Sequence, residues 1–316
     1  MTVAHATSEQ SDPSTVVEWK RGDRVLVVAN PATRGRVDNI EDALARALPP
    51  GVLLDVRLTT GPGEARVIAL DAAPGARLLV AVGGDGTVAD VATAAMEYQL
   101  PLGIVPIGST NIISRELGIP SRADAAARVL FGAHRVRQLD AGVCNGRTFL
   151  HMAGAGFDSR FFALTNPRWK RQVGWPAYLP AAARALRLPA AVARIQVDDQ
   201  TLEMVSPLVL VANGMSIIHP RLRVHNAFRP DDGWIDLMAV TATSPLAIAR
   251  TLGRLAVTQL HRSPYVVHMR AKNVTLETDP VLPIQLDGDV VSETPATFEV
   301  RPGAMRIVVP LPGHSP

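Results

Sequence analysis

Cysteine is almost absent from this chain of 316 residues. Its one cysteine, Cys144, excludes a disulfide framework and any zinc site built on a cysteine cluster. Aromatic residues make up only 4%, and three lysines (Lys20, Lys170 and Lys272) among 32 basic residues leave 29 arginines. Because the formal net charge is only +3, we expect no general binding to nucleic acid.

Long apolar runs are missing too. No run reaches the roughly 18 residues of a transmembrane helix, and the polar stretch from Met1 to Thr15 has no apolar segment of the signal-peptide type. We therefore expect a cytoplasmic protein whose residues 1–21 form a flexible tail. The hydrophobic share of 47% is ordinary for a globular protein, and the length favours two domains.

Several catalytic motifs are also absent. A P-loop needs Gly-Lys before Ser or Thr, but the three lysines follow Trp19, Trp169 and Ala271. The pairs Gly84-x-Gly86 and Gly154-x-Gly156 lack the third glycine of a dinucleotide fingerprint. Neither His-Glu-x-x-His nor Gly-x-Ser-x-Gly occurs. The chain is not a standard P-loop ATPase, dehydrogenase, zincin or α/β-hydrolase.

The first half of the chain alternates two patterns. Short apolar runs predict strands at 24–30, 52–58, 78–82 and 102–107, and helical spacing predicts helices at 38–48, 64–72, 87–98 and 121–130. Such an alternation indicates a parallel sheet with helices on its faces. Ligands of such sheets bind at the carboxyl ends of the strands, so we expect residues 22–138 to form a ligand-binding α/β domain.

The second half is rich in short strands separated by turn signals such as Asn145-Gly146. We expect strands at 136–143, 148–153, 195–197, 201–204, 208–212, 235–240, 266–270, 273–277, 284–286, 296–300 and 305–309, with helices at 177–188 and 245–259. This pattern predicts an all-β domain over residues 139–316, a sandwich or a barrel.

The most informative motif runs from Gly83 to Thr87 and reads Gly-Gly-Asp-Gly-Thr. It follows the third predicted strand and opens a helix, so its glycines permit close approach of a ligand to the backbone. The N-terminus of a helix attracts phosphate, and Asp85 beside a phosphate suggests a bridging Mg²⁺. A tight turn with a capping residue is the alternative.

A second polar loop follows the next strand. Gly108, Ser109, Thr110 and Asn111 stand at the start of another predicted helix. Their side chains are typical of helix caps, yet two neighbouring loops of this kind favour a nucleotide site. Asn30-Pro31 at the end of the first strand is a third candidate.

Taken together, these motifs resemble the lipid kinase family of bacterial diacylglycerol kinases and the sphingosine and ceramide kinases. The resemblance covers about residues 22–312 and rests on Asn30-Pro31 with Gly35, Gly83 to Thr87, Pro106 to Asn111 with Arg115, Leu117 to Pro120, Gly154 to Asp158, Asn213-Gly214, Asp231 to Gly233 and Asp287 to Asp289. The glycine loop alone is shared with NAD kinases and phosphofructokinases, but the whole series is specific.

The resemblance implies an N-terminal three-layer α/β/α domain, as in NAD kinase and phosphofructokinase, with a β-sandwich behind it and ATP in the cleft between them. The last strands could return to the N-terminal domain. The resemblance further implies that the ATP phosphates and the catalytic Mg²⁺ are held by Gly83, Gly84, Asp85, Gly86 and Thr87, with Asp85 as a catalytic residue. The residues implied to contact the nucleotide are Asn30, Thr59 or Thr60, Gly108, Ser109 and Asn111.

The resemblance also implies that Asp287 is the general base and that Asp232, with main-chain oxygens of Arg229 and Ile235, forms a structural metal site. Both aspartates precede a glycine, so a hairpin turn at Asp287-Gly288 and a plain turn at Asp232-Gly233 are the alternatives. His151, in an expected core strand, is interpreted as structural.

This chain departs from the family pattern at two positions. Ile112 stands where many bacterial members have an aspartate that belongs to an acidic water network, and Asp289 replaces the more usual glutamate after Asp-Gly. The first departure puts the metal handling of the site in question, and the second shifts any contact of the side chain, because aspartate is one methylene shorter.

The segment 160–194 mixes aromatic and basic residues, including Trp169, Lys170 and Arg171. Such a mixture suits the headgroup zone of an anionic membrane, and an amphipathic stretch near Leu179 could lie on that interface. A helix packed on the sandwich with a solvated basic face is an equal alternative.

We therefore predict an ATP- and Mg²⁺-dependent lipid kinase with diacylglycerol as its first-choice substrate, peripheral contact with the membrane and a homodimer as an open option. A kinase of a soluble substrate such as NAD and a silent nucleotide- or lipid-binding regulator are the alternatives.

Overall fold

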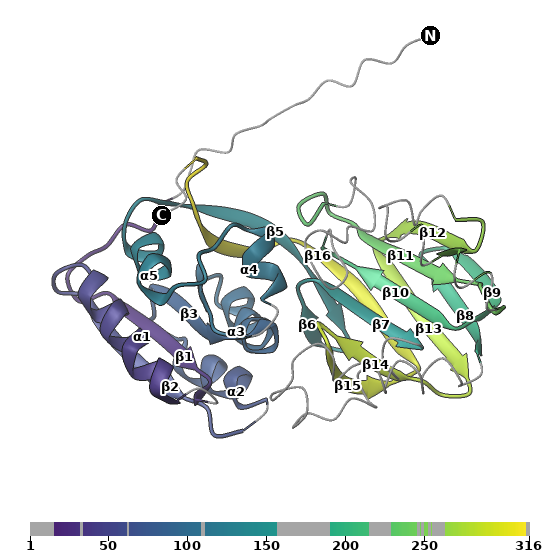
Figure 1. Ribbon diagram of the computed structural model, residues 1–316, viewed down its shortest axis with the longest axis horizontal. Coiled ribbons are helices and arrows are strands. Elements are labelled where there is room, and N and C mark those ends of the chain that lie inside the picture. The colour runs from purple at the N-terminus through teal and green to yellow at the C-terminus, as the bar shows by residue number, and fades with distance from the viewer. Residues whose placement is uncertain are drawn as a thin grey trace, which may run out of the picture.

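A computed structural model describes residues 16–313 except for 32–33, 62, 109–110, 157–189, 215–228, 245–246, 248–249, 252–253 and 255–262. Its described residues form two units that lie side by side (Figure 1). The expected helix at 177–188, most of the one at 245–259 and residues 1–15 of the expected tail fall outside the described residues.

The N-terminal unit alternates strands and helices, as predicted. In chain order it contains β1 (Arg24–Ala29), α1 (Arg34–Ala47), β2 (Leu53–Leu58), α2 (Glu64–Ala72), β3 (Leu78–Gly83), α3 (Asp85–Glu97), β4 (Leu102–Pro106), α4 (Ile112–Glu116) and α5 (Ala123–Phe131). The four strands are parallel in the order β2-β1-β3-β4. β3 and β4 are fully buried, which explains their continuous apolar sequence.

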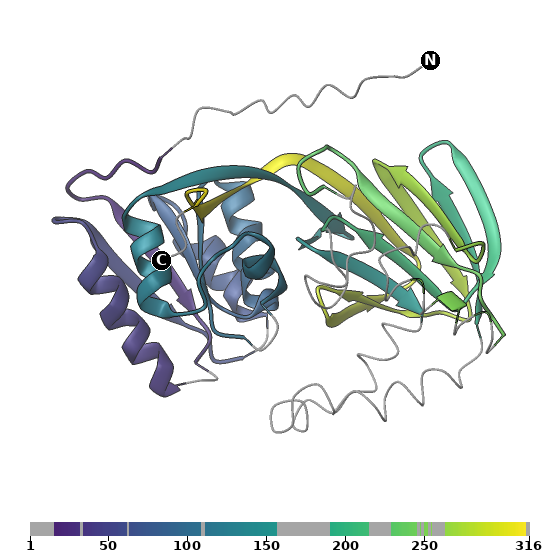
Figure 2. The same cartoon turned by 45° about the horizontal axis from the view of Figure 1, so that its top comes forward.

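Helices cover both faces of this sheet (Figure 2). Leu79 and Ile104 pack toward α2 and α3 together with Val91. Their neighbours Val80 and Val105 point to the other face and pack toward α1 and α5. Because successive strand residues face opposite sides, the two apolar cores follow directly from the alternation along each strand. The predicted three-layer domain is confirmed.

The C-terminal unit is a sandwich of two sheets, also as predicted. Its strands are β5 (His134–Cys144), β6 (Arg147–Phe149), β7 (Met152–Gly156), β8 (Ala191–Val197), β9 (Gln200–Ser206), β10 (Leu208–Ala212), β11 (Ile235–Val240), β12 (Val266–Ala271), β13 (Asn273–Asp279), β14 (Pro283–Leu286), β15 (Asp289–Glu293) and β16 (Ala296–Pro310). One sheet has the order β12-β11-β10-β7-β14-β15. Its inner face packs on β5, β8, β13 and β16 through a shared apolar core.

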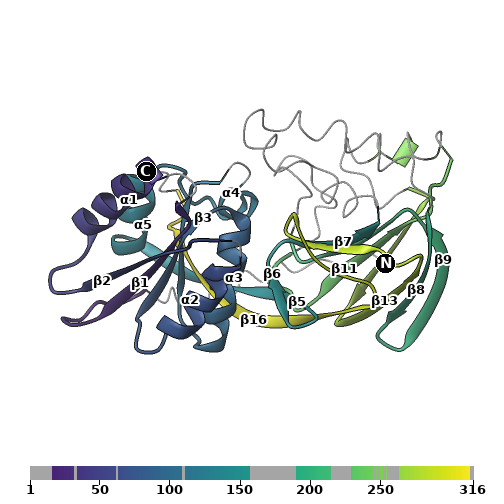
Figure 3. The same cartoon turned by 90° about the horizontal axis from the view of Figure 1, so that it is seen from below.

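β16 belongs to both units (Figure 3). It pairs with β13 near Phe298, with β4 at Ile307, and with β5 along almost its whole length. The sequence predicted two strands here, at 296–300 and 305–309. The structure has one strand with a register shift between Arg301 and Met305, where the N–H of Gly303 donates to the Asp140 carboxylate at 2.7 Å.

Two further differences concern the site. The strand expected at 148–153 is divided into β6 and β7, because the N–H groups of Leu150, His151 and Met152 all donate to the Asp287 carboxylate at 2.8 to 2.9 Å rather than to a neighbouring strand. β15 was not predicted. It pairs with β14 in a hairpin whose Leu286 and Asp289 are opposite each other.

Candidate functional site

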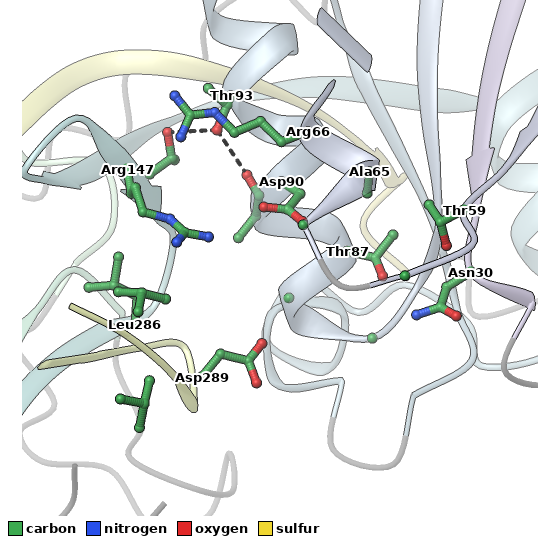
Figure 4. A pocket seen from close by; sticks show the side chains of 18 of the residues that line it. Asn30, Thr59, Ala65, Arg66, Thr87, Asp90, Thr93, Arg147, Leu286 and Asp289 are labelled. Atoms are coloured by element: carbon green, nitrogen blue, oxygen red, sulfur yellow. Dashed lines mark hydrogen bonds between the residues drawn. The ribbon is translucent and has the colours of Figure 1, made fainter. Parts of the chain in front are cut away.

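A cavity of about 900 Å³ lies between the two units, at the carboxyl ends of the parallel strands (Figure 4). This is the edge where ligands of such sheets bind. Residues of both units line it: Asn30 after β1, Thr59 after β2, Thr87 and Asp90 on α3, Arg147 on β6 and Asp289 on β15.

The glycine loop joins β3 to α3, and its packing leaves no room for a side chain at Gly83. A Cβ on Gly83 would lie 2.4 Å from the Thr87 side chain, and one on Gly108 would lie 2.6 Å from the Cα of Gly84. The β3–α3 and β4–α4 loops are thus packed backbone against backbone. The cap residue of α3 makes no side-chain hydrogen bond, so it does not compete with a ligand anion for the first N–H groups of the helix.

The residues predicted to contact the nucleotide from β1 and β2 all line the cavity. Backbone N–H groups of Asn30 and Thr59 donate to carbonyls of adjacent strands at 3.0 and 2.9 Å. The N–H and the hydroxyl of Thr60 both donate to the Glu64 carboxylate at 2.6 Å, and these bonds hold the pKa of Glu64 below its usual value. Asn30 and Thr59 are therefore fixed in place, while the Thr60 hydroxyl is already engaged.

The β4–α4 loop contributes less directly. Gly108 and Asn111 do not line the cavity, and Ser109 lies outside the described residues. Asn111 has a left-handed backbone (φ 47°), and its Nδ2 donates to the carbonyl of Gly108 at 2.8 Å. Its side chain therefore closes the loop that supports the glycine loop.

The Asp85 carboxylate lies on the α4 side of the glycine loop. Its Oδ1 accepts the N–H of Ile113 at 3.3 Å, which caps the start of α4. The loop residues that line the cavity are Gly84, Gly86 and Thr87. A role for Asp85 in binding phosphate or Mg²⁺ stays a prediction.

Asp287 forms the turn of the β14–β15 hairpin with Gly288. Both have positive φ, 48° and 96°, as a two-residue turn of type I′ requires, so the hairpin reading of this motif is confirmed. The Asp287 carboxylate accepts the three N–H groups that divide β6 from β7. Burial raises its pKa, against the opposing effects of the His151 ring and these three donors.

Asp289, two residues later, has a different environment. It lines the cavity, and a Cβ on Gly86 would lie 2.6 Å from its Oδ2. The carboxylate therefore reaches the first turn of α3, where Figure 4 shows it pointing across the cavity toward the glycine loop. The sequence singled out Asp289 only as a departure from a family pattern.

Two arginines stand at the other end of the cavity, and sequence reasoning missed both. Arg66 comes from α2 and Arg147 from β6, on opposite units. Asp90 lies between them on α3, where burial raises its pKa and the two arginines oppose that effect. Nη2 of Arg66 also donates to the carbonyl of Gly146 at 3.3 Å, which links the two units. No local motif marks these residues, because only the fold brings them together.

The predicted structural metal site does not fit the residues present. Asp232 Oδ2 accepts a hydrogen bond from Arg270 Nη2 at 2.5 Å, and its Oδ1 accepts the N–H of Trp234 at 3.2 Å. Arg270 and Lys272 lie 5.4 and 5.2 Å from the centre of the Trp234 ring. Two cations thus occupy the surroundings in which a divalent ion would need negative charge. Elsewhere among the described residues, no group of three or more His, Cys, Asp or Glu side chains could hold a metal ion.

Within the part of the chain that the structure describes, no helix is long and apolar enough to cross a membrane. The basic aromatic segment predicted to contact a membrane, 160–194, lies outside the described residues except for 190–194.

Comparison with known proteins agrees with this architecture. The diacylglycerol kinase catalytic domain matches residues 24–144, and the "YegS C-terminal NAD kinase beta sandwich-like domain" matches residues 151–309. A "Probable lipid kinase YegS-like" of Pseudomonas aeruginosa (strain UCBPP-PA14) is 33% identical over 91% of this chain and 95% of the relative. A protein of the same name from Pseudomonas savastanoi pv. phaseolicola is 34% identical over 88% and 90%.

Among solved structures, a "putative diacylglycerol kinase" from Bacillus anthracis str. Sterne is 25% identical, with a TM-score of 0.74 over 93% of this chain and 99% of the other. The two matched domains follow each other in the same order as the two units of the structure, and together they cover most of the chain. The chain therefore belongs to the YegS-like lipid kinases, which join a diacylglycerol kinase catalytic domain to a C-terminal β-sandwich domain.

Proposed function

We propose that this lipid kinase transfers the γ-phosphoryl group of ATP to a hydroxyl group of a membrane lipid, with diacylglycerol as the first substrate class to test. The observation that carries the proposal is the cavity in which the N-terminus of α3 meets the Asp289 carboxylate. The helix N-terminus favours phosphate, and a carboxylate beside it can orient or deprotonate a hydroxyl nucleophile.

Asp289 is the better candidate for the proton acceptor, although the sequence favoured Asp287. The Asp287 oxygens already accept three backbone N–H groups, and its side chain is not part of the cavity lining. Asp289 lines the cavity and reaches α3. In this mechanism Asp289 takes the proton of the lipid hydroxyl while the oxygen attacks the γ-phosphorus and the ADP oxygen leaves.

Mg²⁺ fits this cavity as an ion that arrives with ATP. Asp90 is a second carboxylate in the cavity lining, and carboxylate oxygens are the protein ligands that Mg²⁺ prefers, with the remaining ligands usually taken from phosphates and water. When bound, it would neutralise the charge on the phosphates. The α3 N–H groups bind and orient the phosphates, and Asn30 and Thr59 contact the rest of the nucleotide.

The first experiment is transfer of label from the γ-phosphate of ATP to a total lipid extract in the presence of Mg²⁺, followed by partition between organic and aqueous phases. We expect a labelled lipid, whose chromatographic mobility identifies the acceptor. Asp289→Asn should reduce the rate by about 10²- to 10⁴-fold, the usual contribution of a general base, and retain ATP binding.

Asp198→Asn is the control, because it makes the same substitution in the exposed β8–β9 hairpin, and Asp198 does not line the cavity. It should retain full activity. Label in the aqueous phase alone would contradict a lipid acceptor and favour a soluble substrate. Full activity of Asp289→Asn would remove Asp289 from the role.

We further propose that the segment 160–194 brings the enzyme to anionic membranes. Its mixture of tryptophan and basic residues supports this contact. Charge reversal at Arg168, Lys170 and Arg171 should then weaken sedimentation with anionic vesicles.

A further inference from the structure

A buried histidine stands where the two units meet. His151 lies between β6 and β7 and is only 3% exposed. The mechanism above does not use it. Within the described residues, neither ring nitrogen has a hydrogen-bond partner, although buried polar side chains usually have one.

The backbone around His151 is fixed from several directions. The N–H of His151 donates to Asp287 Oδ1 at 2.9 Å, and its carbonyl accepts the N–H groups of Asn213 and Gly214, both at 2.9 Å. The carbonyl of Leu150 accepts from Asn213 Nδ2 at 3.0 Å. These bonds leave the imidazole little freedom in where it can point.

Gly214 provides the space that the ring occupies. A Cβ at this position would lie 2.2 Å from His151 Nδ1, so no other residue fits without displacing the ring. The same nitrogen also faces the N-terminal unit: Nδ1 lies 3.6 Å from Glu116 Oε2 on α4, and the two side chains are only 4% and 11% exposed. When the ring is protonated, this contact is a buried ion pair between the two units.

Three carboxylates act electrostatically on this ring. Glu116 comes from α4, Asp85 from α3 and Asp287 from the β14–β15 turn. Burial alone would lower the pKa of His151, but Glu116, with smaller effects of Asp287 and Asp85, outweighs burial and raises it. A protonated imidazole at this position compensates negative charges that would otherwise repel one another across the junction.

We infer that His151, paired with Glu116, is a positioning residue that holds the β14–β15 hairpin of the C-terminal unit in place over the glycine loop of the N-terminal unit. The inference rests on the proposed function. The side-chain contact with Glu116 fixes His151 against α4, the backbone N–H of His151 donates to Asp287, and Asp287 stands two residues before Asp289. The pair therefore sets the distance between the Asp289 carboxylate and phosphates bound at α3.

Loss of this pair should affect the chemical step more than nucleotide binding. ATP contacts at Asn30, Thr59 and α3 belong to the N-terminal unit alone, whereas Asp289 reaches them from the other unit. Since a displacement of about 1 Å can cost on the order of 100-fold in rate, we expect a reduced kcat and a nearly unchanged KM for ATP.

The test is a double-mutant cycle with His151→Gln, Glu116→Gln and the double variant. Each single variant should lose about 10- to 100-fold in kcat, with KM for ATP changed less than about twofold. Because the two residues act as one pair, the double variant should be no worse than the worse single one. Hydrogen exchange at residues 286–290 should accelerate in all three, a readout that needs no activity.

His134→Gln is the matched control. His134 is equally buried, at 2%, but its Nε2 accepts the N–H of Val17 at 3.0 Å and its Nδ1 lies 2.9 Å from the carbonyl of Gly132. Burial lowers its pKa. This variant should lose thermal stability and keep its kcat and its hairpin exchange.

Three results would overturn the inference: wild-type kcat in folded His151→Gln, additive effects in the double variant, or unchanged exchange at the hairpin. If the wild-type protein phosphorylates no lipid, the proposed function fails, while exchange and thermal stability still test the ion pair. If His151→Gln does not fold, Glu116→Gln tests the same pair, because the Glu116 side chain is the more exposed of the two.

Discussion

Asp287 and Asp289 are two residues apart, yet their side chains have opposite surroundings. The turn between β14 and β15 aims Asp287 at the backbone of residues 150–152 and Asp289 at the cavity. A carboxylate that accepts three backbone N–H groups fixes a loop, since each donor would otherwise be buried without a partner. Asp287 therefore has a structural task that can be measured separately from catalysis.

Asp287→Asn should destabilise the protein by about 1–3 kcal/mol, the cost of one buried donor left unpaired. The asparagine oxygen can still accept two of the N–H groups, but its NH₂ would face the third. Urea unfolding measures the change in the free energy of unfolding.

Asp198→Asn is the comparison, because Asp198 also accepts backbone N–H groups in a hairpin turn, those of Lys272 and Asn273. Asp198 is exposed, so water can replace a lost acceptor and the cost should be smaller. Equal stability of Asp287→Asn and wild type would contradict the structural role of Asp287.

For the site residues, the sequence predicted which residues lie near the cavity better than it predicted where their side chains point. Asn30, Thr59 and Thr87 are in the cavity as predicted. Asp85 and Asn111 stand beside it, because their side chains close the loops that form its floor. Arg66 and Arg147 could not be predicted, since they are 81 positions apart and meet only across the cleft.

At Asp232, just before β11, a side chain of the neighbouring strand β12 stands where a metal ion was expected. Asp232 could have held a metal, and the sequence alone allowed this. β12 pairs with β11 so that Arg270 lies opposite Asp236, and the guanidinium then reaches Asp232. His268 on the same strand bonds Asp236 at 2.7 Å. The charges of this region are thus balanced by side chains of the neighbouring strand.

The region should therefore not require a divalent ion. Terbium luminescence excited through tryptophan reports an ion close to Trp234, and we expect no signal from the wild-type protein without nucleotide. Arg270→Ala removes the competing cation and should produce a signal, while EDTA should leave the wild-type unfolding temperature unchanged.

Because the Arg270–Asp232 pair is partly exposed, at 46% and 21%, its removal should cost at most about 1 kcal/mol of stability. Arg301→Ala is a control of similar exposure away from Trp234, since Arg301 pairs with Glu299. A terbium signal from wild type that Trp234→Phe abolishes would contradict the replacement of a metal by Arg270.

Strands and helices with a strong apolar periodicity could be predicted from the sequence. The features that were missed have physical causes. The helix at 64–72 and the strands at 208–212 and 235–240 agree with the sequence patterns to the residue. β15 was missed because Asp289 to Glu293 has three polar residues among five. The break between β6 and β7 was missed because its cause, Asp287, lies more than 130 positions away.

The two units share one ten-stranded sheet, so hydrogen-bonded strands run from one unit into the other. β5 and β16 run side by side from Phe298 and Cys144 in the sandwich to Pro310 and His134 beside the N-terminal helices. Met305 and Ile307 belong to the N-terminal core, while Phe298 and Val300 of the same strand belong to the sandwich core. Detachment of β16 would therefore expose apolar residues of both cores.

The molecule should therefore unfold in a single transition, although its length suggests two domains. Two tryptophans report on different units: Trp19 packs against Phe131 in the N-terminal unit, with ring centres 5.5 Å apart, and Trp234 lies in the sandwich. Two single-tryptophan variants, one that keeps only Trp19 and one that keeps only Trp234 of the four tryptophans, should have the same unfolding midpoint in urea, as two-state unfolding requires. Burial raises the pKa of the Cys144 thiol to about 12, so its reaction with a thiol reagent should follow the same curve.

Ile307→Ala tests the shared strand directly. Ile307 is 1% exposed and packs in the N-terminal core, so the substitution should cost about 2–5 kcal/mol. Both tryptophan probes should shift by the same amount, because β16 transmits the loss to the sandwich, whereas Val281→Ala at a 57% exposed position should shift neither. A lower midpoint for Trp19 with an unchanged midpoint for Trp234 would show that the units unfold separately, and that the shared strand does not couple them.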